Sequence, residues 1–272
     1  MLPGLLEALV QPGADLVGGV GVAGPRRARQ DGAGRGHTHH PGEAEDLPPA
    51  HLPRLATVPA DLSLDAALDL TRTGDLWLFR GRTAADRAIQ LSTNSPVNHV
   101  GMAVVIDDLP PLMWHAELGR ALPDVWAGGH HRGVQLHDLG DAVRQWVHRY
   151  GQRAWLRQLD RPVTARMEDE LLRTVARLDG TPFPSTARLA GRWVAGRLPR
   201  VGPAGGAVGE LAVETAYCAE VVATTYQAMG LLPAHRRAAW YDPGSFWSGD
   251  DLVLETGARL GGEIAVLVPA AS

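Results

Sequence analysis

Cysteine is almost absent from this sequence, which holds a single one, Cys218, among 272 residues. One cysteine excludes an intramolecular disulfide, so the fold has to be stabilised by its core. The chain also lacks a run of about 18 apolar residues, the length that a membrane-spanning helix needs, and no such helix is expected. An excess of positive charge is missing as well. The formal net charge of −4 gives no electrostatic basis for binding nucleic acid.

The first residues of the chain lack the signals of export. Residues 1–24 carry no basic leading stretch, and Glu7 and Asp15 interrupt their apolar runs. Neither a signal peptide nor an anchor is predicted, and a cytoplasmic location is expected. Residues 1–60 are rich in Gly, Ala, Pro, Arg and His without a sustained apolar period, which predicts a disordered extension. Within it, the histidine cluster at residues 37–40 is expected to be solvated rather than to bind a metal.

Residues 61–272 are predicted to form one α+β domain. Apolar periodicity predicts helices over residues 61–71, 83–91, 139–150, 163–178 and 215–229. Runs of β-branched and apolar residues predict strands over residues 75–79, 97–106, 112–117 and 133–136, and a strand with a turn in 250–268. The strands 97–106 and 112–117 are expected to pair as an antiparallel hairpin. The Gly-rich residues 202–209 are expected to form a loop.

Cys218 is predicted to lie at the start of the helix over residues 215–229. Thr215 is a suitable N-cap, which places the thiol in the first helical turn. There, unpaired backbone N–H groups and the positive end of the helix dipole favour the thiolate, the nucleophilic form of cysteine. The alternative is a buried cysteine that packs as a small hydrophobic side chain.

Two predicted strands carry polar residues that suit a cysteine nucleophile. Strand alternation puts His99 and Gly101 on one face, where the glycine leaves room beside the imidazole. His115 and Glu117 share a face of the next strand, so one of them is expected to lie beside His99 and orient it. The alternative for each residue is a purely structural role.

Three short motifs follow one another along the chain: Gly74-Asp75 before a strand, Asn98-His99-Val100-Gly101, and Tyr217-Cys218-Ala219-Glu220. In content and order they resemble the NlpC-type cysteine peptidases and amidases in their circularly permuted form. That group is similar to the lecithin–retinol acyltransferase type of enzyme. The resemblance covers roughly residues 72–250. It implies a permuted papain-like fold of the α+β class, with an antiparallel sheet or small barrel packed against helices.

The resemblance implies roles for five residues. Cys218 is the nucleophile, His99 the general base and His115 the orienting residue, with Glu117 as the alternative orienting residue. Tyr217 is a candidate donor to the oxyanion. The implied reaction is cleavage of an amide (peptide), ester or thioester bond through an acyl-enzyme.

Several alternatives and partners belong to this interpretation. The alternatives are acyl transfer to a lipid, a non-catalytic ligand-binding module on the same fold, and an unrelated α+β domain whose His and Cys are structural. A small-molecule, peptide or lipid substrate is expected, with no nucleic acid, no cofactor and no metal. The spacing of His130, His131 and His137 matches no strong zinc pattern, and a solvated loop is expected there.

Overall fold

The computed structural model describes residues 61–83, 87, 90, 95–107, 109–183, 207–250 and 252–270. The extension predicted for residues 1–60, its histidine cluster at 37–40 and nearly all of the helix predicted over 83–91 therefore lie outside the described residues.

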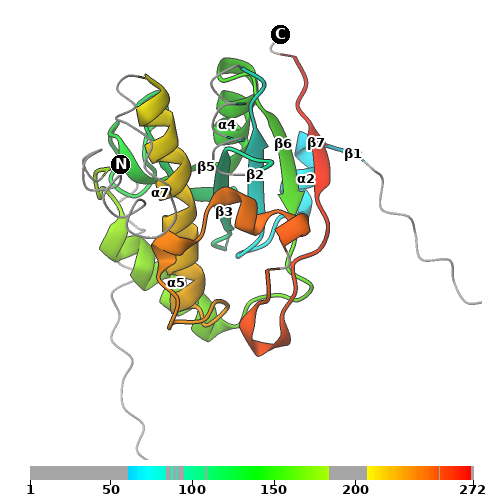
Figure 1. Cartoon of the computed structure of the whole chain (residues 1–272), viewed down its shortest axis with the longest axis vertical. Coiled ribbons are helices and arrows are strands. Elements are labelled where there is room, and N and C mark those ends of the chain that lie inside the picture. Colours follow the sequence, from blue (N-terminus) through cyan, green and yellow to red (C-terminus); the bar gives the residue numbers. More distant parts are fainter. Residues whose placement is uncertain are drawn as a thin grey trace, which may run out of the picture. The chain divides into compact units, whose positions relative to one another are not determined.

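The centre of the fold is a seven-stranded sheet (Figure 1). In spatial order the strands are β1 (Asp61–Ser63), β7 (Ile264–Leu267), β6 (Arg153–Arg157), β2 (Leu76–Arg80), β3 (His99–Val104), β4 (Leu112–Glu117) and β5 (Gly133–Asp138). The β1–β7 pair is parallel and the other neighbouring pairs are antiparallel. Within the described ranges β1 and β5 each pair with one strand only, so the sheet is open. The predicted α+β class with a sheet packed against helices is confirmed, and the small barrel given as its alternative is wrong.

Within the described ranges, four helices flank this sheet. They are α2 (Leu64–Leu70), α4 (Leu139–Arg144), which continues as η1 (Gln145–Arg149), α5 (Ala165–Leu178) and α7 (Ala207–Ala228). Short 3-10 turns follow at η2 (Ala238–Trp240), η3 (Pro243–Phe246), η4 (Ser248–Asp250) and η5 (Glu255–Gly257). Ser63, Asp138 and Thr164 cap α2, α4 and α5 by accepting a backbone N–H, as N-cap residues do. None of the helices in the described ranges combines the length and the apolar character needed to cross a membrane.

The helices divide between the two faces of the sheet. Helix α7 packs on β3 and β4 (Figure 1), in a buried cluster that includes Val100, Met102 and Trp114. Helices α2 and α4 belong to a second buried cluster, which includes Phe79 and Ala103. Because strand side chains alternate between faces, even-numbered β3 residues face α7 and odd-numbered ones face α4. This division decides which residues can share a site.

Asp75 of the Gly74-Asp75 motif has a structural role at the start of β2. Its side chain is buried and accepts from the backbone N–H groups of Arg72 and Leu159, both at 2.9 Å, and from Gln158 Nε2 at 3.1 Å. These bonds join β2 to the segment after β6. The preceding Gly74 has φ +89°, a conformation that favours glycine.

Candidate metal centre

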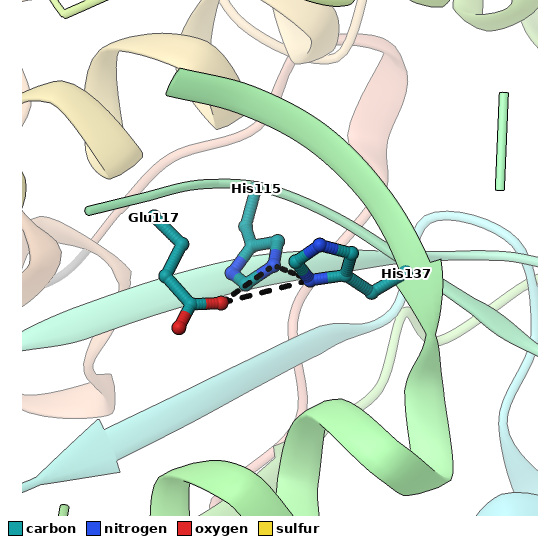
Figure 2. Close-up of side chains that lie close together, drawn as sticks. All are labelled: His115, Glu117 and His137. Atoms are coloured by element: carbon teal, nitrogen blue, oxygen red, sulfur yellow. Dashed lines mark hydrogen bonds and ion pairs between the residues drawn. The ribbon is translucent and has the colours of Figure 1, made fainter. Parts of the chain in front are cut away.

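Strands β4 and β5 bring three metal-ligating side chains together. His115 and Glu117 are two residues apart on β4, so their side chains leave the same face of the sheet. In the antiparallel register Gln135 lies opposite His115, and His137 lies opposite Met113. Diagonal neighbours on one face are within reach of long side chains. His137 therefore reaches His115, and the side chain of Glu117 turns toward both imidazoles (Figure 2).

The three ligand atoms surround one point (Figure 2). His115 Nε2 lies 3.0 Å from His137 Nδ1, while Glu117 Oε2 lies 3.8 Å from His115 Nε2 and 3.6 Å from His137 Nδ1. A point equidistant from atoms with these separations lies about 2.0 Å from each of them, which is the length of zinc–nitrogen and zinc–oxygen bonds. The three side chains already have the spacing that one ion requires.

Burial makes this arrangement costly in the absence of an ion. His115 is 0%, His137 1% and Glu117 2% exposed. The Tyr150 hydroxyl donates to Glu117 Oε1 at 2.8 Å, whereas Glu117 Oε2 receives no hydrogen bond from the described part of the chain. A buried oxygen left without a donor costs on the order of 1–3 kcal/mol. An ion at the centre of the triangle would satisfy it.

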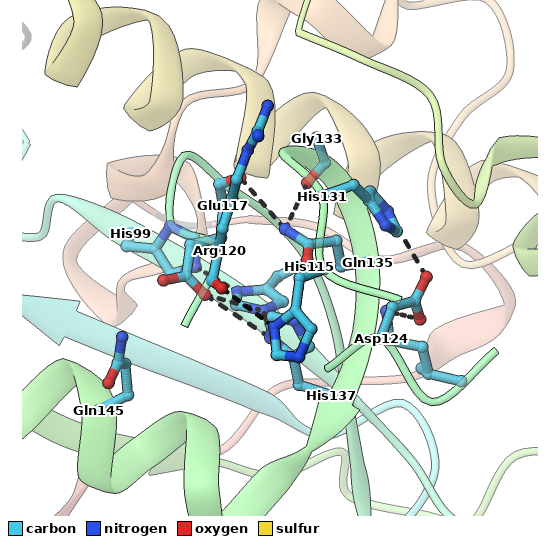
Figure 3. Close-up of polar contacts among 12 residues, drawn as sticks. His99, His115, Glu117, Arg120, Asp124, His131, Gly133, Gln135, His137 and Gln145 are labelled. Carbon is cyan, nitrogen blue, oxygen red and sulfur yellow. Dashed lines mark hydrogen bonds and ion pairs between the residues drawn. The ribbon is translucent and has the colours of Figure 1, made fainter. Parts of the chain in front are cut away.

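The histidines form a directed chain of hydrogen bonds (Figure 3). Gln135 Oε1 lies 3.0 Å from His137 Nε2, so that nitrogen carries the proton and donates. The neutral His137 then accepts at Nδ1 from His115 Nε2 at 3.0 Å. His115 in turn accepts at Nδ1 from His99 Nε2 at 2.9 Å. The chain begins at His99 Nδ1, for which the described residues provide no hydrogen-bond partner.

Aromatic packing holds His99 at the head of this chain. Its ring stacks on Trp146, with centroids 3.8 Å apart and planes at 18°. Gly101 allows β4 to pack close to β3. A Cβ at Gly101 would lie 2.8 Å from Met113 Cγ, which is a clash, and 3.4 Å from His115 Cβ. The small residue on the His99 face is therefore needed for the contact between His99 and His115.

Burial also keeps the imidazoles neutral. It lowers the pKa of His99 to about 3 and the pKa of His137 to about 4. Burial, followed by the neighbouring His137 and His99 rings, lowers the pKa of His115 well below its usual value. Burial raises the pKa of Glu117, against the hydrogen bond from Tyr150. A metal ion needs deprotonated ligands, and the neutral imidazoles meet this condition.

Cys218 lies away from this cluster. It is about three turns from the start of α7, whereas the sequence predicted the first turn. Its side chain is buried and the thiol donates to Thr215 O at 3.1 Å. Cys218 packs in the same cluster as Val100, while His99 stacks on Trp146 of the other cluster. The sheet therefore stands between the predicted nucleophile and its predicted base.

The remaining predicted residues divide in the same way. The structure brings His99, His115 and Glu117 together on the α4 face. Tyr217 stays with α7, where its ring packs 5.2 Å from that of Phe183, centroid to centroid. Its predicted role toward an oxyanion has no counterpart near His99.

His137 is the residue that sequence reasoning missed. It was expected in a solvated loop, but it is buried on β5. The available signal was strand alternation, because Gly133, Gln135 and His137 share one strand face and His137 lies one residue beyond the predicted strand end. Gln135 and Tyr150, which bind the outer atoms of His137 and Glu117, carry no sequence signal of their own.

No family model matches this chain, and no curated protein matches it either. Among solved structures, the chain is similar to the metalloprotein yiiX (DUF1105) from Escherichia coli O157:H7, at 21% sequence identity and a TM-score of 0.35. That match covers 61% of this chain and 68% of the other.

The predicted membership of the permuted NlpC-type family is wrong, and so is the predicted cysteine hydrolase or acyltransferase activity. No model of that family matches the chain. Within the fold, Cys218 is buried inside a helix on the face of the sheet opposite His99. The motifs that carried the resemblance are short, and Asp75 and Cys218 serve the core instead.

We expect Cys218 to behave as an inert thiol. Iodoacetamide should label it at least about 10-fold more slowly than a free cysteine between about pH 5 and pH 9, because the buried thiol is inaccessible to the reagent. A His99→Ala variant should label at the same rate, and mass spectrometry of the modified peptide measures both rates. Rapid labelling at low pH that slows in the variant would contradict this assignment.

Proposed function

We propose that this protein binds a divalent transition-metal ion, zinc by its donor set, through His115 Nε2, His137 Nδ1 and Glu117 Oε2. The observation that carries this function is the buried Glu117 Oε2, which has no donor in the described ranges and faces two imidazole nitrogens at 3.8 and 3.6 Å. Two imidazoles and one carboxylate form a known ligand set of zinc centres.

The outer hydrogen bonds support all three ligands. Gln135 accepts the Nε2–H of His137, which leaves Nδ1 with a lone pair for the ion. The Tyr150 hydroxyl binds Glu117 Oε1 and so leaves Oε2 for the ion. His99 Nε2 can accept from His115 Nδ1 across their 2.9 Å contact, once His115 Nε2 binds the ion. Such outer partners fix the tautomer and orientation of metal ligands.

Ion binding then requires a defined proton rearrangement. In the ion-free chain His115 is protonated at Nε2 and donates to His137. In the ion-bound state the same proton lies on His115 Nδ1 and is donated to His99, whose own proton moves to its Nδ1. Each imidazole keeps one proton throughout, so the three histidines change their tautomers and not their charge.

Three protein ligands leave one zinc coordination position open. Because the ligands are buried beneath α4 and the Trp146 ring, we assign the protein the binding of the ion and no reaction. The permuted papain-like topology, the small-molecule, peptide or lipid partner, the absence of a nucleic-acid partner and the cytoplasmic location stay predictions. Ion binding depends on none of them.

Competition with a chromophoric chelator tests this function. The metal-free protein is expected to take up zinc. Glu117→Gln should weaken the zinc affinity by about 100-fold, because even the loss of a residue that only supports a metal ligand weakens affinity by up to about 100-fold. His137→Gln should do the same. The matched control is His148→Gln, since His148 is exposed on η1. Equal affinity in Glu117→Gln, His137→Gln and the control would refute the site.

His37, His39 and His40 offer further imidazole groups to added zinc in the full chain. The titration is therefore repeated in a background where His37, His39 and His40 are alanine, and the Glu117-dependent site is expected to persist there. Cobalt substituted for zinc should show ligand-field bands without a sulfur-to-cobalt charge-transfer band. A sulfur band would mean that Cys218 binds the ion, which contradicts the proposed ligand set.

A further inference from the structure

A second group of metal-ligating side chains lies beyond the other end of β5. Asp124 and His131 come from the β4–β5 connection, His131 two residues before the start of β5, and Asp179 follows α5. One ligand atom from each lies within 4.8 Å of the others, and His131 Nε2 is 3.5 Å from Asp124 Oδ2 (Figure 3). None of these residues belongs to the His115–Glu117–His137 site.

The Asp124 carboxylate is held by hydrogen bonds to one of its two oxygens. Its Oδ1 accepts from the backbone N–H groups of Trp126 at 3.0 Å and Leu136 at 3.2 Å. Its side chain is 0% exposed, yet Oδ2 has no hydrogen-bond donor in the part of the chain that the structure describes. The two backbone donors thus orient this buried oxygen toward His131 Nε2, 3.5 Å away, and toward Asp179.

The backbone after α5 brings Asp179 to the same place. Gly180 N–H donates to Val134 O and Val134 N–H donates to Thr181 O, both at 3.0 Å, so this segment runs along the outer edge of β5. Gly133 permits the approach, because a Cβ there would collide with Thr181 O. Asp179 Oδ1 is buried, and it too lacks a donor among the described residues.

Two buried carboxyl groups this close are unfavourable as a pair of anions. Burial, followed by the Asp124 charge, raises the pKa of Asp179 to about 8. A divalent cation between the two carboxyl groups would neutralise both oxygens at once.

We propose that Asp124 Oδ2, Asp179 Oδ1 and the imidazole of His131 form a second cation site that takes a harder divalent ion, of the Mn²⁺ class. Two carboxylate oxygens outnumber the single imidazole, and oxygen ligands suit Mn²⁺. The first site has the opposite ratio and suits zinc. His131 is 26% exposed along its side chain, which gives an ion a route from solvent.

Electron paramagnetic resonance of free Mn²⁺ tests this site in the full chain preloaded with zinc. One Mn²⁺ is expected to bind, and Asp179→Asn and Asp124→Asn should each weaken its affinity by at least about 10-fold. Asparagine at position 124 keeps an acceptor for the two backbone donors. The matched control is Asp169→Asn, an exposed carboxylate on α5, which should bind Mn²⁺ as the wild type does.

Two further readouts separate this site from loss of folding and from the first site. Asp179→Asn should leave the ion-free protein at least as stable as the wild type, because it removes a buried carboxyl next to Asp124. Glu117→Gln should retain the Mn²⁺ site, so failure of zinc binding leaves this result intact. The second site is overturned if the wild type binds no Mn²⁺, or if Asp179→Asn binds it as tightly as Asp169→Asn.

Discussion

Relative to a His99→Gln variant, the metal-free protein is expected to lose about 2 kcal/mol of unfolding free energy as the pH falls from 6.5 to 4.5. Burial lowers the pKa of His99 from 6.5 to about 3. Below pH 6.5 the unfolded chain binds a proton at this position and the folded chain does not. The loss of unfolding free energy per pH unit therefore rises from about 0.7 kcal/mol at pH 6.5 toward about 1.4 kcal/mol at lower pH, until the folded pKa is reached.

The comparison with a variant is needed because other buried groups oppose His99. Burial raises the pKa of Asp75, Glu117 and Asp179, so these carboxyl groups bind protons more readily in the folded state and stabilise it as pH falls. Their contributions cancel in the difference between two chains that share them. Urea denaturation in chelator at stepped pH measures the difference.

The exposed His148→Gln change serves as the control for this measurement. Its curve of unfolding free energy against pH should run parallel to that of the wild type. A His99→Gln curve that is also parallel to the wild type would mean that His99 is accessible to protons in the folded state. That result would contradict the buried, stacked imidazole.

Zinc is expected to stabilise the protein strongly, and much less when Glu117 is replaced. At a free zinc concentration one thousand times its Kd, a single ion adds about 4 kcal/mol to the unfolding free energy. If Glu117→Gln weakens affinity by about 100-fold, the same zinc concentration adds about 1.4 kcal/mol. Thermal unfolding at buffered free zinc measures both, and the wild-type Tm should rise by roughly 8–16 °C.

The glutamine variant is suited to this test because it keeps the acceptor for the Tyr150 hydroxyl and removes only the charge. Its zinc-free Tm should therefore stay close to that of the wild type, while its response to zinc shrinks. Equal zinc-induced shifts in Glu117→Gln and His148→Gln would place the stabilising ion elsewhere in the chain.

Local sequence signals predicted much of the secondary structure. The strand over residues 112–117 is β4 as predicted, and the helix over 163–178 differs from α5 by two residues at its start. Two elements did not follow from local signals. Strand β6 carries an arginine at each end, which hides its apolar centre. Helix α7 begins at Ala207, inside a Gly-rich stretch that predicted a loop, because packing on the sheet outweighs helix propensity.

The sequence by itself determined which side chains share a strand face. Alternation placed His99 with Gly101 and His115 with Glu117 before any fold was known. Only the tertiary structure decided what these faces meet, since pairing register and helix placement depend on contacts between distant segments. The β4–β5 register added His137 and Gln135 to the cluster. Helix α7 packs on the opposite face of the sheet, so Cys218, the predicted nucleophile, is a core residue outside this cluster.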